Sequence, residues 1–319
     1  MKKSVIRLIV IVLLVSSLLL LSSCKGRVAG GENPIDTATA ARMVQTGTQG
    51  LELRILPNTP PAVMYDQNEL ITIVELNNRG NSDLYPQDCF VQITGFDTNI
   101  LRGDISTPKM CSESLDILEG KNLYNVYGGV NMLEFRAPNV QLPFGVFEYT
   151  PNLNFLTCYR YHTMANPQVC LDPLFYQITS EQKNCIPHGI GMSGQGGPVG
   201  VNYVGVNMVG GQAIFEISIT NFGTGRVLHP DADISRCGET SLEYEDVDKV
   251  RYDVSLMGGS PVNCKPSDKI VRLTNGNGKM VCRFNINGNV AFETPLLIDL
   301  DYSYIQSQTK QVKIVRTPE

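Results

Sequence analysis

Hydrophobic and polar residues alternate with a period of two in many short stretches of this chain, a pattern that predicts β-strands. The clearest run covers residues 296–304, where Leu, Ile, Leu, Tyr and Tyr share one face and Asp, Asp and Ser share the other. Shorter runs cover residues 51–55, 71–78 and 215–221, and Gly, Pro or Asn closes each of them. One packed face and one wet face are typical of an antiparallel sheet. No long stretch keeps the helical period, so we predict an all-β protein.

The strand pattern also repeats along the chain. Asn78 and Asn221 each end a strand just before a glycine turn, and they are 143 residues apart. Tyr159 and Tyr302 are again 143 residues apart. Two further pairs of anchors lie between them in the same order: Pro108-x-x-Cys111 with Pro261-x-x-Cys264, and Gly129-x₅-Phe135 with Gly278-x₅-Phe284. Turn residues recur in any β protein, but four anchors in one order predict a tandem duplication.

Each copy contains about seven or eight predicted short strands separated by turns. We therefore predict two tandem immunoglobulin-like antiparallel β-sandwiches that lack the central Trp of antibody domains. Val312 and Ile314 are predicted to form a final hairpin strand after a turn at residues 306–311. The predicted boundaries are a signal peptide at 1–23, a flexible linker at 24–50, a first domain at 51–190, a Gly-rich seam at 191–198 and a second domain at 199–319.

The amino-terminal segment has the pattern of an export signal. Lys2, Lys3 and Arg7 precede an apolar run over residues 8–21, which is shorter than the roughly 20 residues of a spanning helix. The run ends in Leu-Ser-Ser-Cys24, which resembles the lipobox of prokaryotic lipoproteins. That resemblance implies cleavage before Cys24, a diacylglyceryl group on its sulfur and anchoring on the outer side of the cell membrane. An uncleaved signal anchor and a simply secreted protein are the alternatives.

A second resemblance lies in the run Ile-Val-Glu-Leu-Asn-Asn-Arg-Gly-Asn-Ser-Asp that ends at Asp83. It is similar to the "strand, Asn, x, Gly" opening of CARDB-like modules, which are immunoglobulin-like domains of bacterial and archaeal surface proteins. The resemblance covers only this short run in each copy. It implies adhesion or scaffolding and carries no catalytic residues.

Charge and cysteine content narrow the picture further. The net charge of -5 argues against a nucleic-acid partner, which requires a basic face. Eight cysteines follow Cys24, and an even number in an exported chain predicts disulfides. None forms a Cys-x-x-Cys pair, so the sequence supports neither a zinc ribbon nor a redox centre.

The repeat suggests how the cysteines pair, because two of them hold similar positions in each copy. The predicted disulfides are Cys89–Cys111, Cys237–Cys264 and, across one local loop, Cys170–Cys185. Cys158 and Cys282 are then unassigned. Either they join across the two domains or one of the earlier pairs is wrong.

Candidates for chemistry are few. The segment Gly189–Gly194 matches G-x-G-x-x-G, but a phosphate loop needs a strand before it and a helix after it, so we predict a flexible seam. Ser193 with His188 would be the catalytic pair of a hydrolase, although Ser193 lacks the second glycine of a nucleophile elbow. His162 and His229 are predicted at strand ends on the surface.

Two other groups of side chains invite a binding role. Asp231 and Asp233 offer oxygens to calcium, together with the acidic run at 243–248, but the EF-hand spacing is absent and a solvated acidic loop is the alternative. The tyrosines at positions 159, 161, 302 and 304 would line an aromatic ligand groove or pack in the sheet core, and their alternation favours the core.

These observations predict a non-catalytic lipoprotein of the cell surface that acts in binding, adhesion or envelope scaffolding. Its expected partners are the lipid bilayer, through Cys24, and a surface protein or glycan, without a cofactor. The alternative is a solute- or glycan-binding lipoprotein that uses the domain seam, with residues 189–200 as a hinge. An envelope hydrolase that depends on Ser193 is the third possibility.

Overall fold

A computed structural model describes residues 44–113, 115–177, 183–238 and 242–318. These residues form an all-β fold, as predicted, with two short 3₁₀ helices, η2 (Pro86–Asp88) and η3 (Asp104–Ser106). The predicted signal peptide, Cys24 and most of the predicted linker lie outside the described residues. Within the described ranges, no helix has the length and apolar character needed to cross a membrane.

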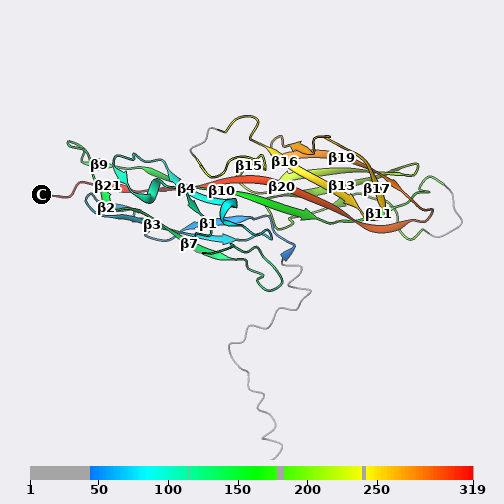
Figure 1. Cartoon of the computed structure of the whole chain (residues 1–319), viewed down its shortest axis with the longest axis horizontal. Helices are drawn as coiled ribbons and strands as arrows, with labels where there is room; N and C mark the ends of the chain where they lie inside the picture. The colour runs from blue at the N-terminus through cyan, green and yellow to red at the C-terminus, as the bar shows by residue number, and fades with distance from the viewer. Residues whose placement is uncertain (1–43, 114, 178–182, 239–241, 319) are drawn as a thin grey trace, which may run out of the picture. The chain divides into compact units, whose positions relative to one another are not determined.

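One long sheet of eight strands runs through the fold (Figure 1). Its path follows β18 (Ile270–Arg272), β16 (Lys249–Leu256), β20 (Phe292–Gln311), β10 (Asn152–Ala165), β4 (Cys89–Thr94) and β6 (Lys109–Met110). Two further strands pair with other parts of β20: β11 (Gln168–Leu171) and β15 (Arg226–Leu228).

Two smaller antiparallel sheets contribute to the same hydrophobic core as the long sheet. The first is β1 (Leu51–Ile55), β3 (Leu70–Asn78) and β7 (Val130–Ala137). The second is β12 (Ile190–Gly191), β13 (Val199–Val209), β14 (Gln212–Asn221), β19 (Asn277–Ile286) and β17 (Gly259–Lys265). Of the remaining strands, β21 (Lys313–Val315) pairs with both β2 (Val63–Tyr65) and β9 (Glu148–Tyr149), and β5 (Leu101–Arg102) pairs with β8 (Asn139–Val140).

Each of the two repeats contains a corner held by the same set of hydrogen bonds. At the end of β3, Asn78 Nδ2 donates to Ser82 O (2.7 Å), Tyr161 Oη donates to Asn78 Oδ1 (3.1 Å) and Ser82 N donates to Tyr161 Oη (3.3 Å). In the second repeat, Asn221 Nδ2 donates to Gly225 O (2.9 Å), Tyr304 Oη donates to Asn221 Oδ1 (3.1 Å) and Gly225 N donates to Tyr304 Oη (2.8 Å). The partners are displaced by the same 143 residues, so this corner recurs with the spacing of the predicted repeat.

The long strands β10 and β20 pair with each other and relate the two copies by a local twofold axis. Tyr159 lies opposite Tyr304 and Tyr161 lies opposite Tyr302, with Arg160 opposite Ser303 between them. Since Tyr159 and Tyr302 are counterparts in the repeat, this is the arrangement of an isologous interface. The sheet has the same symmetry, because β4 and β6 flank β10 as β16 and β18 flank β20.

Two of the predicted repeat anchors are wrong. Asn78 N donates to Gly129 O and Asn221 N donates to Gly276 O, so the counterpart of Gly129 is Gly276 and not Gly278. Cys111 and Cys264 are not equivalent either, because they bond to cysteines on different strands. A turn residue and a cysteine are compatible with many positions in a β fold, whereas the Asn–Tyr corner requires specific partners.

The structure forms four disulfides, two of them as predicted: Cys89–Cys111, Cys170–Cys185, Cys158–Cys237 and Cys264–Cys282. The predicted Cys237–Cys264 bond is wrong. Cys264 lies directly opposite Cys282 in the β17–β19 ladder, while Cys237 approaches β10 and packs with Leu156. Four disulfides indicate an oxidising environment outside the cytoplasm.

The carboxyl-terminal strands depart from the prediction. β20 continues without a turn through residue 311, and β21 pairs with β2 and β9 instead of forming a hairpin with β20. Sheet bonding also crosses the predicted seam, since all of β10 pairs with β20. Strands from the two halves of the sequence therefore share one sheet.

Candidate functional site

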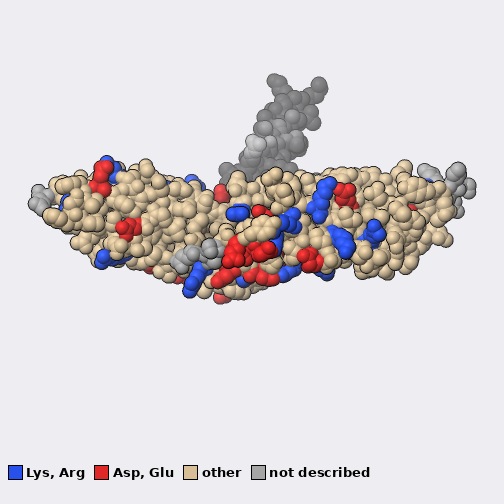
Figure 2. All heavy atoms as spheres, turned by 90° about the horizontal axis from the view of Figure 1, so that it is seen from above, with Lys and Arg blue, Asp and Glu red and all other residues tan. Residues whose placement is uncertain are grey.

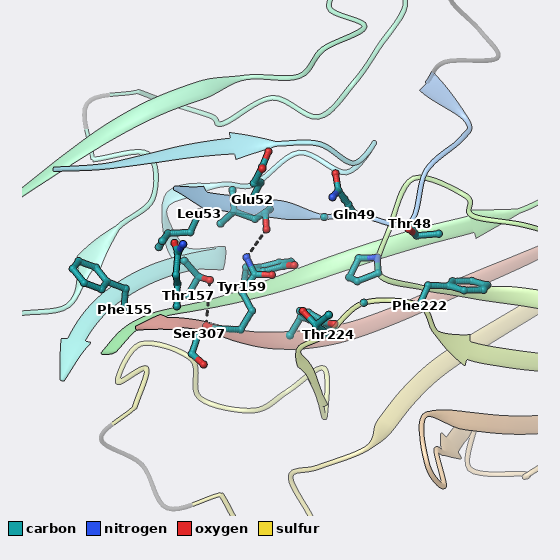
Figure 3. Close-up of a pocket in the computed structure, with 17 residues that line it drawn as sticks. Thr48, Gln49, Glu52, Leu53, Phe155, Thr157, Tyr159, Phe222, Thr224 and Ser307 are labelled. Atoms are coloured by element: carbon teal, nitrogen blue, oxygen red, sulfur yellow. Dashed lines mark hydrogen bonds between the residues drawn. The ribbon is translucent and has the colours of Figure 1, made fainter. Parts of the chain in front are cut away.

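The candidate site is an open groove of about 420 Å³ along the outer edge of β1, which we call the β1 groove (Figure 3). It lies between β1, the strands β10 and β20, and the turn that follows β14. Its lining consists of Thr48, Gln49, Gly50, Leu51, Glu52, Leu53, Phe155, Thr157, Tyr159, Pro198, Phe222, Gly223, Thr224, Tyr304, Gln306, Ser307 and Gln308.

Hydrogen bonds fix the inner end of the groove. Gln306 Nε2 on β20 donates to the carbonyl oxygen of Leu51 on β1, and Thr157 Oγ1 donates to Gln306 O at 3.5 Å (Figure 3). The first bond satisfies an outward-facing carbonyl of β1 within the protein itself. Beyond it, the groove passes the half-buried side chain of Leu53 and is open to solvent.

The groove is close to neutral. Burial raises the pKa of the Tyr159 hydroxyl well above its ordinary value and raises that of Tyr304 as well, so both carry a proton at neutral pH. Among the lining residues, Glu52 alone is charged, and Arg79 Nε lies 2.9 Å from its carboxylate. The surface offers amides, hydroxyls and the apolar side chains of Leu53, Phe155 and Phe222. Such a lining suits an uncharged ligand.

All four tyrosines of β10 and β20 are buried, with 0–3% of each exposed. Core packing, the favoured prediction, is thus confirmed for them, although Tyr159 and Tyr304 also form the floor of the β1 groove. Their rings pack together, with Tyr159 5.7 Å from Tyr304 and Tyr161 6.2 Å from Tyr302 between centroids. The tyrosines therefore shape the groove while they stabilise the sheet.

The corresponding region of the second copy makes further bonds within the chain. There Gly197 lies against the sheet, since a Cβ on it would lie 2.2 Å from Thr163 Oγ1 and 2.8 Å from Tyr302 Oη. Tyr302 Oη is bonded to Thr163 Oγ1 at 2.8 Å and accepts from Val199 N at 3.3 Å. The buried Gln195 side chain bonds Val201 through both its oxygen and its nitrogen. Val201 is the counterpart of Leu53, so the backbone groups that face outward at Leu53 are bonded within the chain in the second copy.

A second, more polar hollow lies on the opposite face of the long sheet. His162 bridges two carboxylates, with Nδ1 2.9 Å from Asp301 and Nε2 3.2 Å from Asp299. The hydrogen bond to Asp301 is the main reason that the pKa of His162 is raised, and burial opposes it. Arg160 lies 3.3 Å from Asp88 in the same hollow. These charges already have partners, so the hollow is a weaker candidate than the β1 groove.

His162 and His229 were both predicted to lie at strand ends. His162 lies inside β10 and not at a strand end, so that prediction is wrong for it. His229 follows β15 directly, as predicted. The long β10 was not apparent from the sequence because its residues near position 162 lack a strict polar alternation.

The candidate calcium residues lie within a mixed-charge loop. Asp231 pairs with Arg251, whose hydrogen bond lowers the pKa of the Asp231 carboxyl, while Asp233 accepts bonds from the backbone and hydroxyl of Ser235. In this region Glu245 pairs with Lys249. Figure 2 shows acidic side chains clustered near the middle of one face, with basic side chains around them. Among the described residues, no three or more His, Cys, Asp or Glu side chains gather in a way that could hold a metal ion.

The nucleotide and hydrolase motifs have other structural roles. Ile190 and Gly191, inside the motif, form β12, and the next element is the strand β13, with which β12 pairs; no helix follows the glycines in the described residues before β13. His188 Nδ1 hydrogen-bonds to the carbonyl oxygen of Ile186, two residues away, at 2.9 Å, and not to Ser193. Gly196 N donates to Gly47 O at 2.8 Å, which gives the Gly-rich seam a fixed partner in the structure.

No motif in the sequence marks the residues of the β1 groove as a site. The available signal was the difference between the short β1 strand and the eleven-residue β13 strand that corresponds to it. A comparison of this chain with models of known protein families finds no match, and a comparison with curated proteins finds none either.

Proposed function

We propose that this chain is an exported, lipid-anchored protein of the cell surface that binds its ligand, without catalysis, in the β1 groove. The observation that carries the binding role is the open groove itself. In the second copy the Gln195 side chain and β12 bond the backbone along the corresponding edge of β13, whereas the first copy leaves its lining groups accessible.

The anchoring part of the proposal rests on the Leu-Ser-Ser-Cys24 motif and on the four disulfides. Two acyl chains on Cys24 would hold the protein on a bilayer, because each buried CH₂ contributes about 0.8 kcal/mol. We expect a Cys24→Ser variant to leave the membrane fraction. Mass spectrometry of the wild-type amino-terminal peptide should find a diacylglyceryl cysteine, and an unmodified peptide would contradict anchoring.

Site-specific photo-crosslinking in intact cells tests the binding role. Gln308 lines the groove, whereas the adjacent Thr309 is exposed outside the lining, so the two positions form a matched pair. We expect a crosslinking residue at position 308 to capture a discrete ligand and one at position 309 to capture none. No adduct at position 308, or the same adducts at both, would reject ligand binding in the groove.

The second candidate is binding of a glycan or small solute in the same groove. The amide and hydroxyl groups of Gln306, Ser307 and Gln308, with the ring of Phe155 opposite Gln308, favour it, since sugars combine hydroxyls with an apolar ring face. A thermal-shift screen of soluble glycans would detect it, because a ligand raises stability by RT ln(1 + [L]/Kd).

A further inference from the structure

The outer edge of β1 is an unpaired edge in the first repeat. β1 pairs with β3 alone among the described strands. Gly50 O accepts from Arg79 N and Leu56 N donates to Ile73 O, so the even-numbered residues of this stretch bond to β3. In an antiparallel ladder the intervening residues then point their backbone groups away from the partner. The N–H and C=O groups of Leu53 and Ile55 therefore face outward.

The second repeat covers the corresponding edge with a strand. Arg54 and Ile55 pair with Glu75 and Val74 of β3. The residues 143 positions later, Ser218 and Ile217 of β14, pair with Tyr203 and Val204. The counterparts of Arg54 and Ile55 are thus Tyr203 and Val204. Those two residues pair antiparallel with β12, which the first repeat lacks among its described strands: Gly191 lies opposite Tyr203 and Ile190 opposite Val204.

β12 also indicates the side chains that suit such an edge. Ile190 is half-buried and packs against the hydrophobic core. Gly191 has open space around its Cβ position, and Met192 N donates to Asn202 O at 2.9 Å, which extends the pairing. The side chain of Gln195 bonds Val201, the counterpart of Leu53, through both its oxygen and its nitrogen. An uncharged amide, one apolar side chain and a hydrogen-bonding backbone therefore cover the edge without any charge.

From this comparison we infer that the ligand of the β1 groove is an extended, uncharged peptide segment of another protein, which adds to β1 as an antiparallel strand. This inference rests on the proposed binding function. Main-chain bonds to Leu53 and Ile55 supply affinity, and an apolar side chain packs beside Leu53 and Phe155. The near-neutral lining, in which Glu52 is paired with Arg79, disfavours a charged segment.

The chain itself provides a probe for this edge. A fluorescent peptide reproducing residues 187–193, Pro-His-Gly-Ile-Gly-Met-Ser, is titrated against the full mature protein. We expect saturable binding. N-methylation at the Met192 position, whose amide faces the neighbouring strand, should weaken binding about tenfold or more. N-methylation at Gly191, whose amide faces away, is the matched control and should have little effect.

A protein variant tests the same contact from the other side. Leu53→Pro removes an outward-facing N–H and leaves the β3 ladder intact, as proline at a sheet edge permits. It should weaken peptide binding about tenfold, whereas Arg54→Ala, which changes a side chain only, should not. If Leu53→Pro fails to fold, hydrogen exchange on the wild-type protein gives the answer. Bound peptide should slow exchange at the Leu53 and Ile55 amides and leave those of Glu52 and Arg54, already bonded to β3, unchanged.

The outcomes separate this inference from the proposed function. Peptide binding that ignores N-methylation at Met192 and does not protect Leu53 and Ile55 would overturn strand addition. Absence of peptide binding, together with a glycan captured at position 308, would also overturn it while the binding role stands. Absence of any ligand at position 308 would reject both.

Discussion

At the residue scale, the Asn–Tyr corner shows how a few side chains hold each repeat together. An amide both donates and accepts, so Asn78 bridges the backbone of the following turn and the hydroxyl of Tyr161 on the facing sheet. Gly80 is required beside it, because a Cβ there would lie 1.8 Å from the Tyr161 hydroxyl. Asn221, Gly223 and Tyr304 repeat this arrangement.

We expect Tyr161→Phe and Tyr304→Phe each to lower the free energy of unfolding by about 1–3 kcal/mol. Each variant removes the hydroxyl that accepts from a backbone N–H and leaves an Asn oxygen with one partner fewer. Denaturant unfolding measures the effect. A neutral result for both variants would show that the corner does not stabilise the repeats.

His162 should make stability depend on pH. Its pKa is raised mainly by the hydrogen bond to Asp301, with Asp299 adding to the effect, so folding favours the protonated ring. The contribution is fully present below the ordinary pKa of 6.5 and is lost as the pH rises through the raised value. We expect His162→Gln to destabilise the protein more at about pH 5 than at about pH 9. Equal losses at both pH values would contradict this.

At the element scale, the disulfides hold loops against the sheets. Cys158–Cys237 ties the loop after β15 to β10, and this loop covers Ser303, which the alternation predicted to be wet but which is fully buried. Ser303 Oγ donates to Pro230 O in that loop at 3.4 Å. A disulfide thereby turns part of an exposed sheet face into an interior one.

The lengths of the loops that the disulfides close predict which disulfide contributes more to the free energy of unfolding. Replacing Cys158 and Cys237 by Ala opens a sequence separation of 79 residues and should cost about 4 kcal/mol. The Cys264 and Cys282 pair spans 18 residues, and its double Ala variant is the control, with an expected cost of about 3 kcal/mol. Denaturant unfolding gives both values. A smaller loss for the Cys158–Cys237 variant would contradict the loop-closure argument.

At the scale of the whole molecule, β10 and β20 make the two repeats depend on each other. Residues 44–190 would expose the full edge of β10 and lack β21, which pairs with β2 and β9. An uncovered edge of that length promotes self-association. The described residues accordingly belong to one compact unit.

We therefore expect residues 44–190 and 191–319 each to aggregate or self-associate when expressed alone. Coexpressed in an oxidising compartment, they should form one complex linked by Cys158–Cys237. Sedimentation and non-reducing electrophoresis measure this. A monomeric fragment 44–190 that unfolds cooperatively would show instead that the first half folds independently.

Much of the fold was accessible from local patterns. Alternation placed the buried face of β20 correctly at Ile298, Leu300 and Tyr302, because each residue's side depends on strand geometry alone. The prediction failed where distant segments meet. The β20 turn and the Cys237–Cys264 bond were wrong, since both depended on which strand lies alongside, and the β1 groove was missed for the same reason.

The sequence by itself determined the all-β class, the Asn–Tyr repeat and two of the four disulfides, because backbone alternation, turn chemistry and short loops act locally. The tertiary structure alone decided that β10 and β20 pair about a twofold axis, which edge β12 covers and which edge is open. Those outcomes depend on contacts between residues more than a hundred positions apart, whose energies are set by packing and strand register and leave no periodic signal in one chain.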